Sequence, residues 1–367
     1  MRYLLKDILI PQPKSKIKAG EGKKEGEYKF FTSSIEQTKF IDIYNYDKEA
    51  LIFGTGGNAN VHYCDTLFST STDCIVMYTE KDIELKLIYY YLKNNIHLLE
   101  DGFKGAGIKH ISKDYILNLS IDLPLKCEQI NILKVIENAE NIILNRKQQL
   151  LKLDELVKSR FIELFGDPEH NEKQWDVFRL DTLCSVSSSK RIYQNELSTD
   201  GVPFLRISDL VNRMDTGSTD CELYIPDERY EELKTLGLVP VTGDVLLTAR
   251  GTLGRCYTIT ERDRFYFQDG MITWLYDFNK ALTRNYLTHL FTMSGFRKQI
   301  DSLQAGSTVA YLSISMTKKL NVMLPPLELQ NQFATFVEQT DKSQLAIQQS
   351  LEQLETLKKS LMQQYFG

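Results

Sequence analysis

The segment LVKSRFIELFG at residues 156–166 has a close counterpart in LKKSLMQQYFG at residues 357–367. Shifting the sequence against itself by 201 positions superimposes these two segments, and the match continues upstream without a gap to Pro124 and Pro325. The 43 positions from 124 to 166 contain 12 identical pairs, which is too many for chance in an ungapped frame. The chain of 367 residues is therefore predicted to be a duplicated unit.

The region before each of these segments repeats as well. The same offset pairs Leu123 with Leu324, Leu119 with Leu320, Ser112 with Ser313, and Gly105 with Gly306. Each copy begins with runs rich in β-branched and aromatic residues, which predict the strands ALIFG (50–54), CIVMYT (74–79), DVLLTA (244–249), GRCYTI (254–259) and MITWLYDF (271–278). A short helix follows in each copy, at 83–95 and at 284–296, and then a last strand that reaches a proline.

After that proline the apolar residues change to heptad spacing, which predicts two long helices of about 35 residues and about 50 Å each. Polar residues interrupt the second heptad pattern at Thr340, Gln344 and Lys358. The residues predicted to form the helix–helix seam are Ile132, Ile136, Ala139, Ile143, Leu150, Leu153 and Val157 in the first copy, and Phe333, Val337, Ile347, Leu351, Leu354 and Leu361 in the second.

Two arrangements of these helices are open. Each could pack on its own domain as an ordinary amphipathic helix. A seam of this length, present twice, favours an antiparallel coiled coil with a pseudo-twofold axis. The predicted fold class is therefore α/β (α+β), with two similar β-rich domains held apart by two long antiparallel helices. The predicted divisions are a first domain at 1–123, a long helix at 124–166, a second domain at 167–324 and a second long helix at 325–367.

Composition describes an ordinary globular chain, with 42% hydrophobic and 25% charged residues. There is no apolar run of about 18 residues that predicts a membrane span, and the N-terminal residues lack the features of a secretory signal, so a cytoplasmic location is expected. The six cysteines are scattered without a CxxC pair, which predicts reduced thiols and no zinc site.

Three patterns that suggest catalysis are weak. The glycine-rich segment IFGTGGNAN (52–60) is similar to turns that hold S-adenosylmethionine, but its counterpart ARGTLGRCY (249–257) favours a tight turn between strands. Glu84-x-Lys86 resembles the tail of a nuclease signature but has no equivalent in the second copy, and the five histidines lack ligand spacing. The chain is expected to be non-catalytic and to need no metal or cofactor.

Two similar domains on a helical spacer suit the reading of two separated places on one extended partner, for which DNA is the natural candidate. The net charge of −5 argues against a nucleic-acid-binding protein with a basic surface all round. Lysines nevertheless gather in one segment, PKSKIKAGEGKKEGEYK (13–29). The residues predicted to contact DNA are Lys14, Lys16, Lys18, Lys23, Lys24, Asn58, Asn60, His62, Lys104 and Lys109 in the first domain, and Lys190, Arg191, Arg206, Arg250, Thr252, Arg255 and Tyr311 in the second.

The sequence also resembles a known family, the specificity subunits of type I restriction-modification systems. The resemblance covers nearly the whole chain, and the segments that carry it are IDLPLKCEQINI (121–132), ELFGDPEHNEKQWDVFRLDTLCSV (163–186), GDVLLTARGTLG (243–254) and NVMLPPLELQNQF (321–333). It implies two target-recognition domains, each reading one half of a bipartite asymmetric DNA site. It further implies that the long helices dock two copies of a DNA-adenine methyltransferase subunit, and through them the restriction translocase subunits.

One departure from the family is the short first domain, which has about 53 residues before its Gly-Thr-x-Gly turn, whereas about 84 precede that of the second copy. Two other functions stay open at this point. A non-catalytic coiled-coil scaffold without sequence-specific DNA readout would also use the long helices, and an enzyme could use Gly54 to Asn60 for S-adenosylmethionine.

Overall fold

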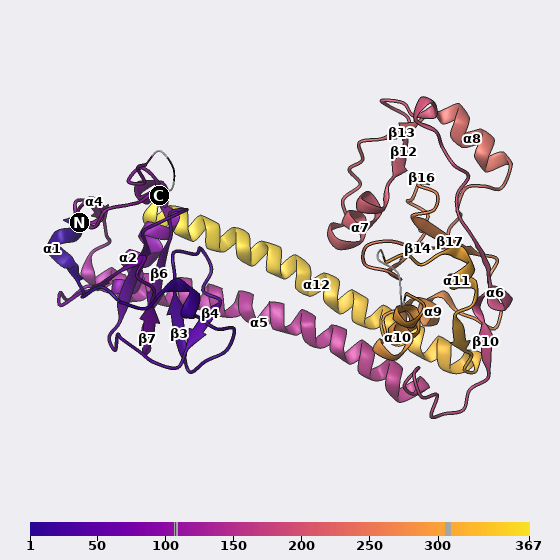
Figure 1. The fold of residues 1–367 in the computed structure, drawn as a ribbon, viewed down its shortest axis with the longest axis horizontal. Helices are drawn as coiled ribbons and strands as arrows, with labels where there is room; N and C mark the ends of the chain where they lie inside the picture. The colour runs from indigo at the N-terminus through magenta and orange to yellow at the C-terminus, as the bar shows by residue number, and fades with distance from the viewer. Residues whose placement is uncertain (106, 108, 305–309) are drawn as a thin grey trace. The chain divides into compact units, whose positions relative to one another are not determined.

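The computed structural model describes residues 1–105, 107, 109–304 and 310–367, so Gly306, the repeat partner of Gly105, lies outside the described residues. Helices and strands alternate along the chain, which confirms the mixed α/β class (Figure 1). The chain divides into two units, unit 1 with Met1–Gln149 and Ile347–Gly367 and unit 2 with Leu150–Ala346. Among the described residues, no helix has both the length and the apolar character needed to cross a membrane.

The described residues of unit 1 form three small sheets. The largest is an antiparallel sheet in the order β2-β8-β5-β6, the second has the order β4-β3-β7, and β1 pairs with β9. The strands are β1 (Arg2–Leu4), β2 (Ile10–Pro11), β3 (Tyr28–Phe31), β4 (Lys39–Ile41), β5 (Ala50–Gly54), β6 (Val61–Cys64), β7 (Phe68–Thr70), β8 (Cys74–Tyr78) and β9 (Ser120–Asp122). The short helices are α1 (Leu5–Ile8), α2 (Leu85–Asn94), α3 (His97–Glu100) and α4 (Lys113–Leu117).

Unit 2 repeats this plan with the sheets β11-β17-β14-β15, β13-β12-β16 and β10-β18. Its strands are β10 (Val177–Arg179), β11 (Ser185–Ser187), β12 (Val202–Leu205), β13 (Tyr224–Ile225), β14 (Val245–Thr248), β15 (Cys256–Thr258), β16 (Tyr266–Phe267), β17 (Ile272–Tyr276) and β18 (Asn321–Met323). Its short helices are α6 (Leu180–Leu183), α7 (Ile207–Thr216), α8 (Asp227–Thr235), α9 (Arg284–Leu290), α10 (Ser294–Ser302) and α11 (Ile314–Lys318).

The sequence repeat is reproduced by the elements. Each of α4, β9 and α5 (Lys126–Phe165) has a counterpart 201 residues further along the chain, in α11, β18 and α12 (Leu327–Phe366). The matched serines cap matched helices, because the Ser112 hydroxyl accepts from the Tyr115 N–H at 3.1 Å and the Ser313 hydroxyl from the Met316 N–H at 3.2 Å. The identity of these serines therefore has a local cause, the satisfaction of an orphan N–H at a helix start.

The repeated glutamines Gln129 and Gln330 are buried at the starts of the long helices. The Gln129 amide donates to the Pro124 carbonyl at 3.1 Å and accepts the Glu84 N–H at 3.2 Å. Gln330 donates to the Pro325 carbonyl and accepts the Thr283 N–H, both at 2.8 Å. A side chain with both a donor and an acceptor is needed here, because each glutamine joins the start of a long helix to that of α2 or α9.

The core of each unit takes residues from both long helices. In unit 1, Ile132 and Ile136 of α5 share a buried cluster with Met362 and Phe366 of α12. Unit 2 has the converse arrangement, with the α5 residues Val157, Phe161 and Phe165 packed with the α12 residues Phe333 and Val337. Phe161 and Phe165 are the 201-offset counterparts of Met362 and Phe366, so each core is completed by the end of the other copy's helix.

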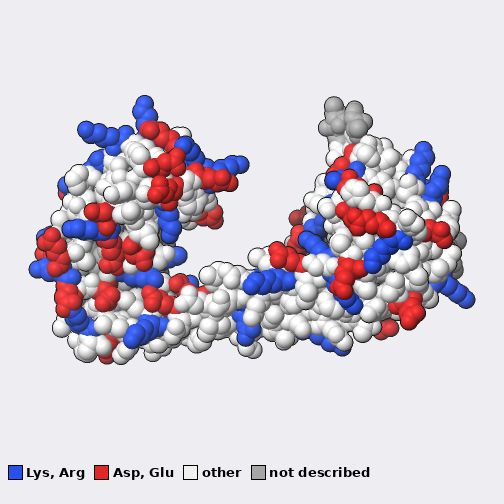
Figure 2. Space-filling view, turned by 90° about the horizontal axis from the view of Figure 1, so that it is seen from below, with Lys and Arg blue, Asp and Glu red and all other residues white. Residues whose placement is uncertain are grey.

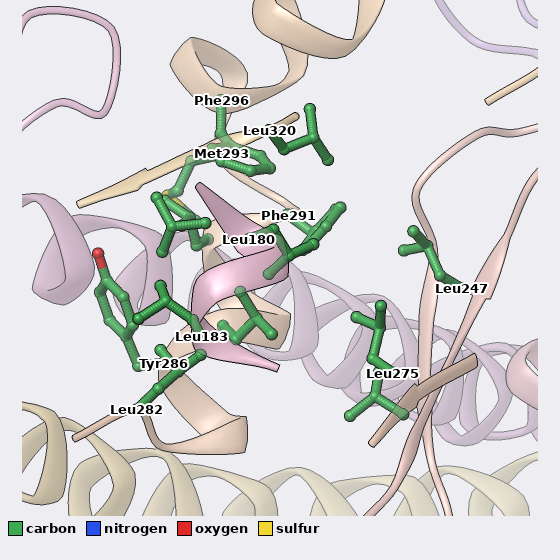
Figure 3. Packing of buried hydrophobic residues seen from close by; sticks show 14 of the residues in the cluster. Leu180, Leu183, Leu247, Leu275, Leu282, Tyr286, Phe291, Met293, Phe296 and Leu320 are labelled. Atoms are coloured by element: carbon green, nitrogen blue, oxygen red, sulfur yellow. The ribbon is translucent and has the colours of Figure 1, made fainter. Parts of the chain in front are cut away.

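Figure 3 shows part of the unit 2 cluster, in which Leu183 of α6 lies beside Tyr286 and Leu282. The Tyr286 ring stacks on Phe161 with centroids 5.5 Å apart, and its hydroxyl donates to the Met323 carbonyl at 2.8 Å. A buried tyrosine hydroxyl is thereby satisfied inside an apolar core.

Within each unit the long helices run antiparallel. In unit 1, Lys358 binds Glu140 at 2.7 Å and Lys147 binds Glu355 at 2.9 Å. In unit 2 the Gln344 amide donates to Asp154 at 2.6 Å. All 13 residues assigned to the seam are buried or half-buried. Five of them, Ile132, Ile136, Val157, Phe333 and Val337, also belong to the cores of the units.

Glu140 gives the helix pairing of unit 1 a dependence on pH. Partial burial alone would raise the pKa of its carboxyl, but hydrogen bonds from Lys358 and Tyr90 outweigh burial and leave the pKa below its ordinary value. A carboxylate with a lowered pKa stabilises the folded state above its unfolded pKa and loses that contribution as pH falls through the folded pKa.

We expect Glu140→Gln to lower the free energy of unfolding by about 1 kcal/mol at neutral pH, because the pair is about one third exposed. The difference from the unmodified chain should shrink as pH falls below the ordinary glutamate pKa of 4.5. Urea unfolding at several pH values measures this, and an equal difference at pH 7 and pH 3 would contradict it.

Candidate nucleic-acid interface

Two hairpin loops occupy equivalent places in the units, the loop between β5 and β6 and the loop between β14 and β15. The Ile111 N–H donates to the Thr55 carbonyl at 3.1 Å, and its repeat counterpart, the Leu312 N–H, donates to the Ala249 carbonyl at 2.9 Å. Thr55 is therefore equivalent to Ala249, and Gly56 to Arg250. Both loops lie between antiparallel strands, as the tight-turn interpretation predicts.

This equivalence corrects one inference from the sequence. The Gly-Thr-x-Gly motifs at 54–57 and 251–254 are not the same turn, because the first begins as β5 ends and the second leads into β15. The glycines that do correspond are Gly57 and Gly251, with φ of 82° and 68°. Glycine suits both positions because other residues rarely adopt this left-handed conformation.

A buried polar side chain holds each loop, and the two units use different residues for it. In unit 1, Asn60 is 5% exposed; its amide oxygen accepts the Gly54 N–H at 3.2 Å, and its amide nitrogen donates to the carbonyls of Asn58 and Ser33. In unit 2 the hydroxyl of Thr248, fully buried, donates to the Thr252 carbonyl at 2.6 Å and accepts the Arg255 N–H at 2.9 Å. Asn60 therefore supports its loop, whereas Gly57 and Asn58 are exposed there.

The loop of unit 2 brings several predicted residues together. The Arg250 guanidinium lies over the Tyr311 ring, 5.0 Å from its centroid, and the two backbones form a β-bridge. Arg255, at the other end of the loop, binds the Asp215 carboxylate at 2.6 Å. Thr252 is exposed between them.

The remaining predicted residues of unit 2 lie away from this loop. Arg191 pairs with Asp269 at 3.0 Å, and Arg206 pairs with Asp209 at 3.2 Å and Glu222 at 2.8 Å. Lys190 is exposed, and its backbone N–H donates to the Tyr266 hydroxyl. These arginines are thus partly neutralised, whereas Arg250 stacks on an aromatic ring.

In unit 1 the predicted lysines Lys14, Lys16, Lys18, Lys23, Lys24, Lys104 and Lys109 are all exposed. Lys23 binds Asp42 at 2.7 Å. Lys14 borders a hollow of about 660 Å³ that also has Thr55, His110 and Lys113 in its wall. The sequence reasoning missed His110 and Lys113, although the offset pairs His110 with Tyr311 and could have identified it.

His62 is half-buried beside the Phe31 ring, and its Nε2 lies 2.9 Å from the Ser34 carbonyl oxygen. Burial lowers the pKa of its imidazole, so the ring is neutral at pH 7. His62 therefore adds no positive charge to this surface.

Charges of both signs cover the visible face of each unit, as Figure 2 shows.

The nuclease-like pair is structural, because Glu84 precedes α2 and the Lys86 ammonium, on α2, binds Glu137 at 2.7 Å. Asp167, Glu169 and His170 approach one another within 4.8 Å, but Lys298 already binds Glu169. The six cysteines are free thiols.

Comparison with known proteins agrees with this architecture. The chain matches the family described as the type I restriction modification DNA specificity domain over residues 2–153 and 172–356. It is 23% identical over 369 residues to the MjaVIII type I restriction enzyme specificity subunit of Methanocaldococcus jannaschii, which covers 92% of this chain and 85% of that protein. It is 22% identical over 359 residues to a Haemophilus influenzae protein provisionally named as such a subunit, covering 88% and 85%.

Among solved structures, the type I restriction-modification S subunit from M. genitalium aligns with a TM-score of 0.64 and 16% identity, over 100% of this chain and 96% of that one. At this identity the likeness establishes the fold. Because the family match spans two segments that together include most of the residues, this chain belongs to the type I restriction-modification DNA specificity family.

Proposed function

We infer that this chain supplies the DNA sequence specificity of a type I restriction-modification complex, with each unit reading one half of a bipartite asymmetric target. The observation that carries this is the pair of equivalent hairpin loops, which have different residues at matched positions. Where unit 1 has Gly56 and His110, unit 2 has Arg250 and Tyr311. The same scaffold with different contact residues is what two different half-sites require.

The chemistry of the two surfaces suggests different contacts. The exposed lysines of unit 1 suit phosphate oxygens, and Arg250 and Arg255 offer paired donors suited to base edges. Because the Asn60 amide supports its own loop, Asn60 is not among the DNA contacts that we propose. We retain 1–123 and 167–324 as the recognition domains, and 124–166 and 325–367 as the helical regions. The scaffold alternative explains the helices but not the membership in a DNA specificity family.

The catalytic steps belong, in this proposal, to partner subunits in the same cytoplasm, a DNA-adenine methyltransferase and through it the restriction subunits. The decisive experiment is single-molecule sequencing of adenine methylation in cells that express this chain with its methyltransferase, compared with cells that lack only this chain. A split asymmetric motif that disappears with the chain supports the proposal. Unchanged methylation by an active partner would refute it.

Arg250→Ala should weaken modification of the natural target by about tenfold, because one bidentate base contact is worth about 1–3 kcal/mol. Its guanidinium packs on Tyr311 at the surface, so the thermal midpoint should change little. The measurement is the methylation rate on target DNA, with Arg262→Ala as the control for an exposed arginine outside the loop. Unchanged target modification would remove Arg250 from the readout.

Exposed leucines suggest where the methyltransferase docks. Leu144 and Leu345 are a repeat pair and are 54% and 60% exposed; Leu156 and Leu357 are another, at 49% and 50%. Leucine has no advantage at a solvent-exposed position. Leucine at both members of a repeat pair is therefore better explained by a partner that binds to both copies. Each unit holds one member of each pair. We therefore propose two equivalent docking sites and two methyltransferase subunits.

Replacing Leu144 and Leu357 of unit 1 with glutamate should reduce the complex from two methyltransferase subunits to one, since a charge at an apolar contact is strongly unfavourable. The mass of the purified complex, measured by light scattering, reports this. Leu151→Glu is the matched control, because Leu151 is 64% exposed and its repeat counterpart is already Glu352. A complex that retains both methyltransferase subunits would count against this docking site.

A further inference from the structure

In unit 2 the end of α7 is fixed to the strand that follows the hairpin loop. The Arg213 guanidinium binds the Asp263 carboxylate at 2.6 Å, and these side chains are 13% and 2% exposed. The Tyr257 hydroxyl joins them, accepting from Arg213 Nε at 3.0 Å and donating to Asp263 at 2.9 Å. A buried, fully bonded network of this kind holds its members in one geometry.

Two residues further along the same helix, Asp215 reaches the loop itself. Its carboxylate accepts two hydrogen bonds from Arg255, from Nη2 at 2.6 Å and from Nη1 at 3.3 Å. This pair is more exposed, at 54% for Asp215 and 28% for Arg255. Arg255 also borders an open hollow of about 470 Å³ whose wall includes Arg213, Thr292 and Arg297.

The geometry of the pair leaves one edge of Arg255 available. Asp215 occupies the end of the guanidinium, where the two Nη groups lie, and the hydrogen bonds of the described residues include no acceptor for Nε. The side edge, formed by Nε–H and one Nη–H, presents two nearly parallel donors. That is the arrangement that binds guanine O6 and N7 together in the major groove.

We propose that Asp215 is a positioning residue that holds Arg255 for bidentate reading of a base edge in the half-site bound by unit 2. The inference rests on the proposed DNA-recognition function. Because the carboxylate cancels the charge of the guanidinium, the pair has little attraction for phosphate and contributes mainly to discrimination between bases. An arginine already held in place also loses less rotamer freedom when it binds. The Arg255 hydrogen bond lowers the pKa of Asp215, so the carboxylate stays ionised at neutral pH.

The test uses the full chain in complex with its methyltransferase, after sequencing has defined the target of the unmodified complex. Methylation rates are measured on DNAs that differ from the target by one base pair at a time, for Asp215→Asn, Arg255→Ala and the control Asp227→Asn. Asp227 also binds an arginine at 2.6 Å, and is similarly exposed at 57%, but it lies on α8 away from the loop. The salt dependence of binding to unrelated DNA is measured in parallel.

Asp215→Asn should lose about tenfold in discrimination at the same base pair that Arg255→Ala affects, and only there. Its binding to unrelated DNA should become more salt-dependent, with a slope steeper by about 0.9, because the charge of Arg255 is released. Discrimination retained in Asp215→Asn, or a loss spread evenly over all positions with a lowered thermal midpoint, would overturn the inference. Failure of the proposed function shows itself separately, as no methylation motif for the unmodified complex.

Discussion

Phe165→Ala should destabilise unit 2 by about 3–5 kcal/mol while leaving unit 1 nearly unchanged. Phe165 is fully buried, and its ring lies 4.8 Å from that of Tyr286 and 5.5 Å from that of Phe333. Its removal leaves a cavity among the aromatic rings of Phe161, Tyr286 and Phe333. Phe165 belongs to the first copy of the repeat, yet the loss of stability is expected in unit 2, most of whose core comes from the second copy.

Hydrogen exchange resolved along the chain measures this, with faster exchange expected in β14, β17 and α9 than in β5 and β8. Phe366→Ala is the reciprocal variant and should increase exchange in unit 1, where Phe366 is 5% exposed and its carbonyl accepts from the Asn95 amide at 2.7 Å. Ile162→Ala, 40% exposed on the turn of α5 next to Phe165, is the control. Faster exchange in unit 1 after Phe165→Ala would contradict the reciprocal cores.

Inserting seven residues at the same level of both long helices, after Gln149 in α5 and after Ile347 in α12, should abolish methylation of the natural target and create a target with a longer spacer. One heptad preserves the seam pattern and adds about 10 Å of helix, which corresponds to about three base pairs of DNA. Each long helix begins in one unit and ends in the other, so the insertion lengthens both connections equally.

Sequencing of adenine methylation gives the new motif directly. Both half-sites should keep their bases, and only the number of unspecified base pairs between them should grow. An insertion in α5 alone is the control, because it puts the Glu140–Lys358 and Lys147–Glu355 pairs of unit 1 out of register with the Gln344–Asp154 pair of unit 2 and should impair folding. A doubly lengthened chain that folds and still marks only the original spacing would show that the helices do not set the distance.

The sequence predicted the parts of the fold that depend on local pattern. The strands at β5, β8, β14, β15 and β17 follow from β-branched and aromatic runs, and the long helices follow from heptads that place even Lys358 and Gln344 at half-buried positions. The offset of 201 could be detected in the sequence because the capping serines, the buried glutamines and the terminal aromatic residues have structural roles that few other residue types can fill.

What the sequence could not supply depends on contacts between distant residues. Asn60 has the chemistry of a base-reading residue, and only the approach of Gly54 and Ser33 shows that its amide is already used. The two Gly-Thr-x-Gly motifs look equivalent by letters, but the partner of the Ile111 N–H shows that they are three residues out of step. Charge pairing of Arg255 by Asp215, 40 residues away, is likewise invisible in a linear pattern.

The reciprocal cores also impose an order on folding during synthesis. The core of unit 2 includes Val157, Phe161 and Phe165, which are synthesised before the rest of that unit. This core can therefore form once Val337 has left the ribosome. The core of unit 1 includes Met362 and Phe366, which follow Ile136 in the sequence by 226 and 230 residues. At elongation rates of about 5–20 residues per second, that delay is on the order of tens of seconds. The half made first is therefore the half completed last, and its unfinished apolar surface stays exposed during that interval.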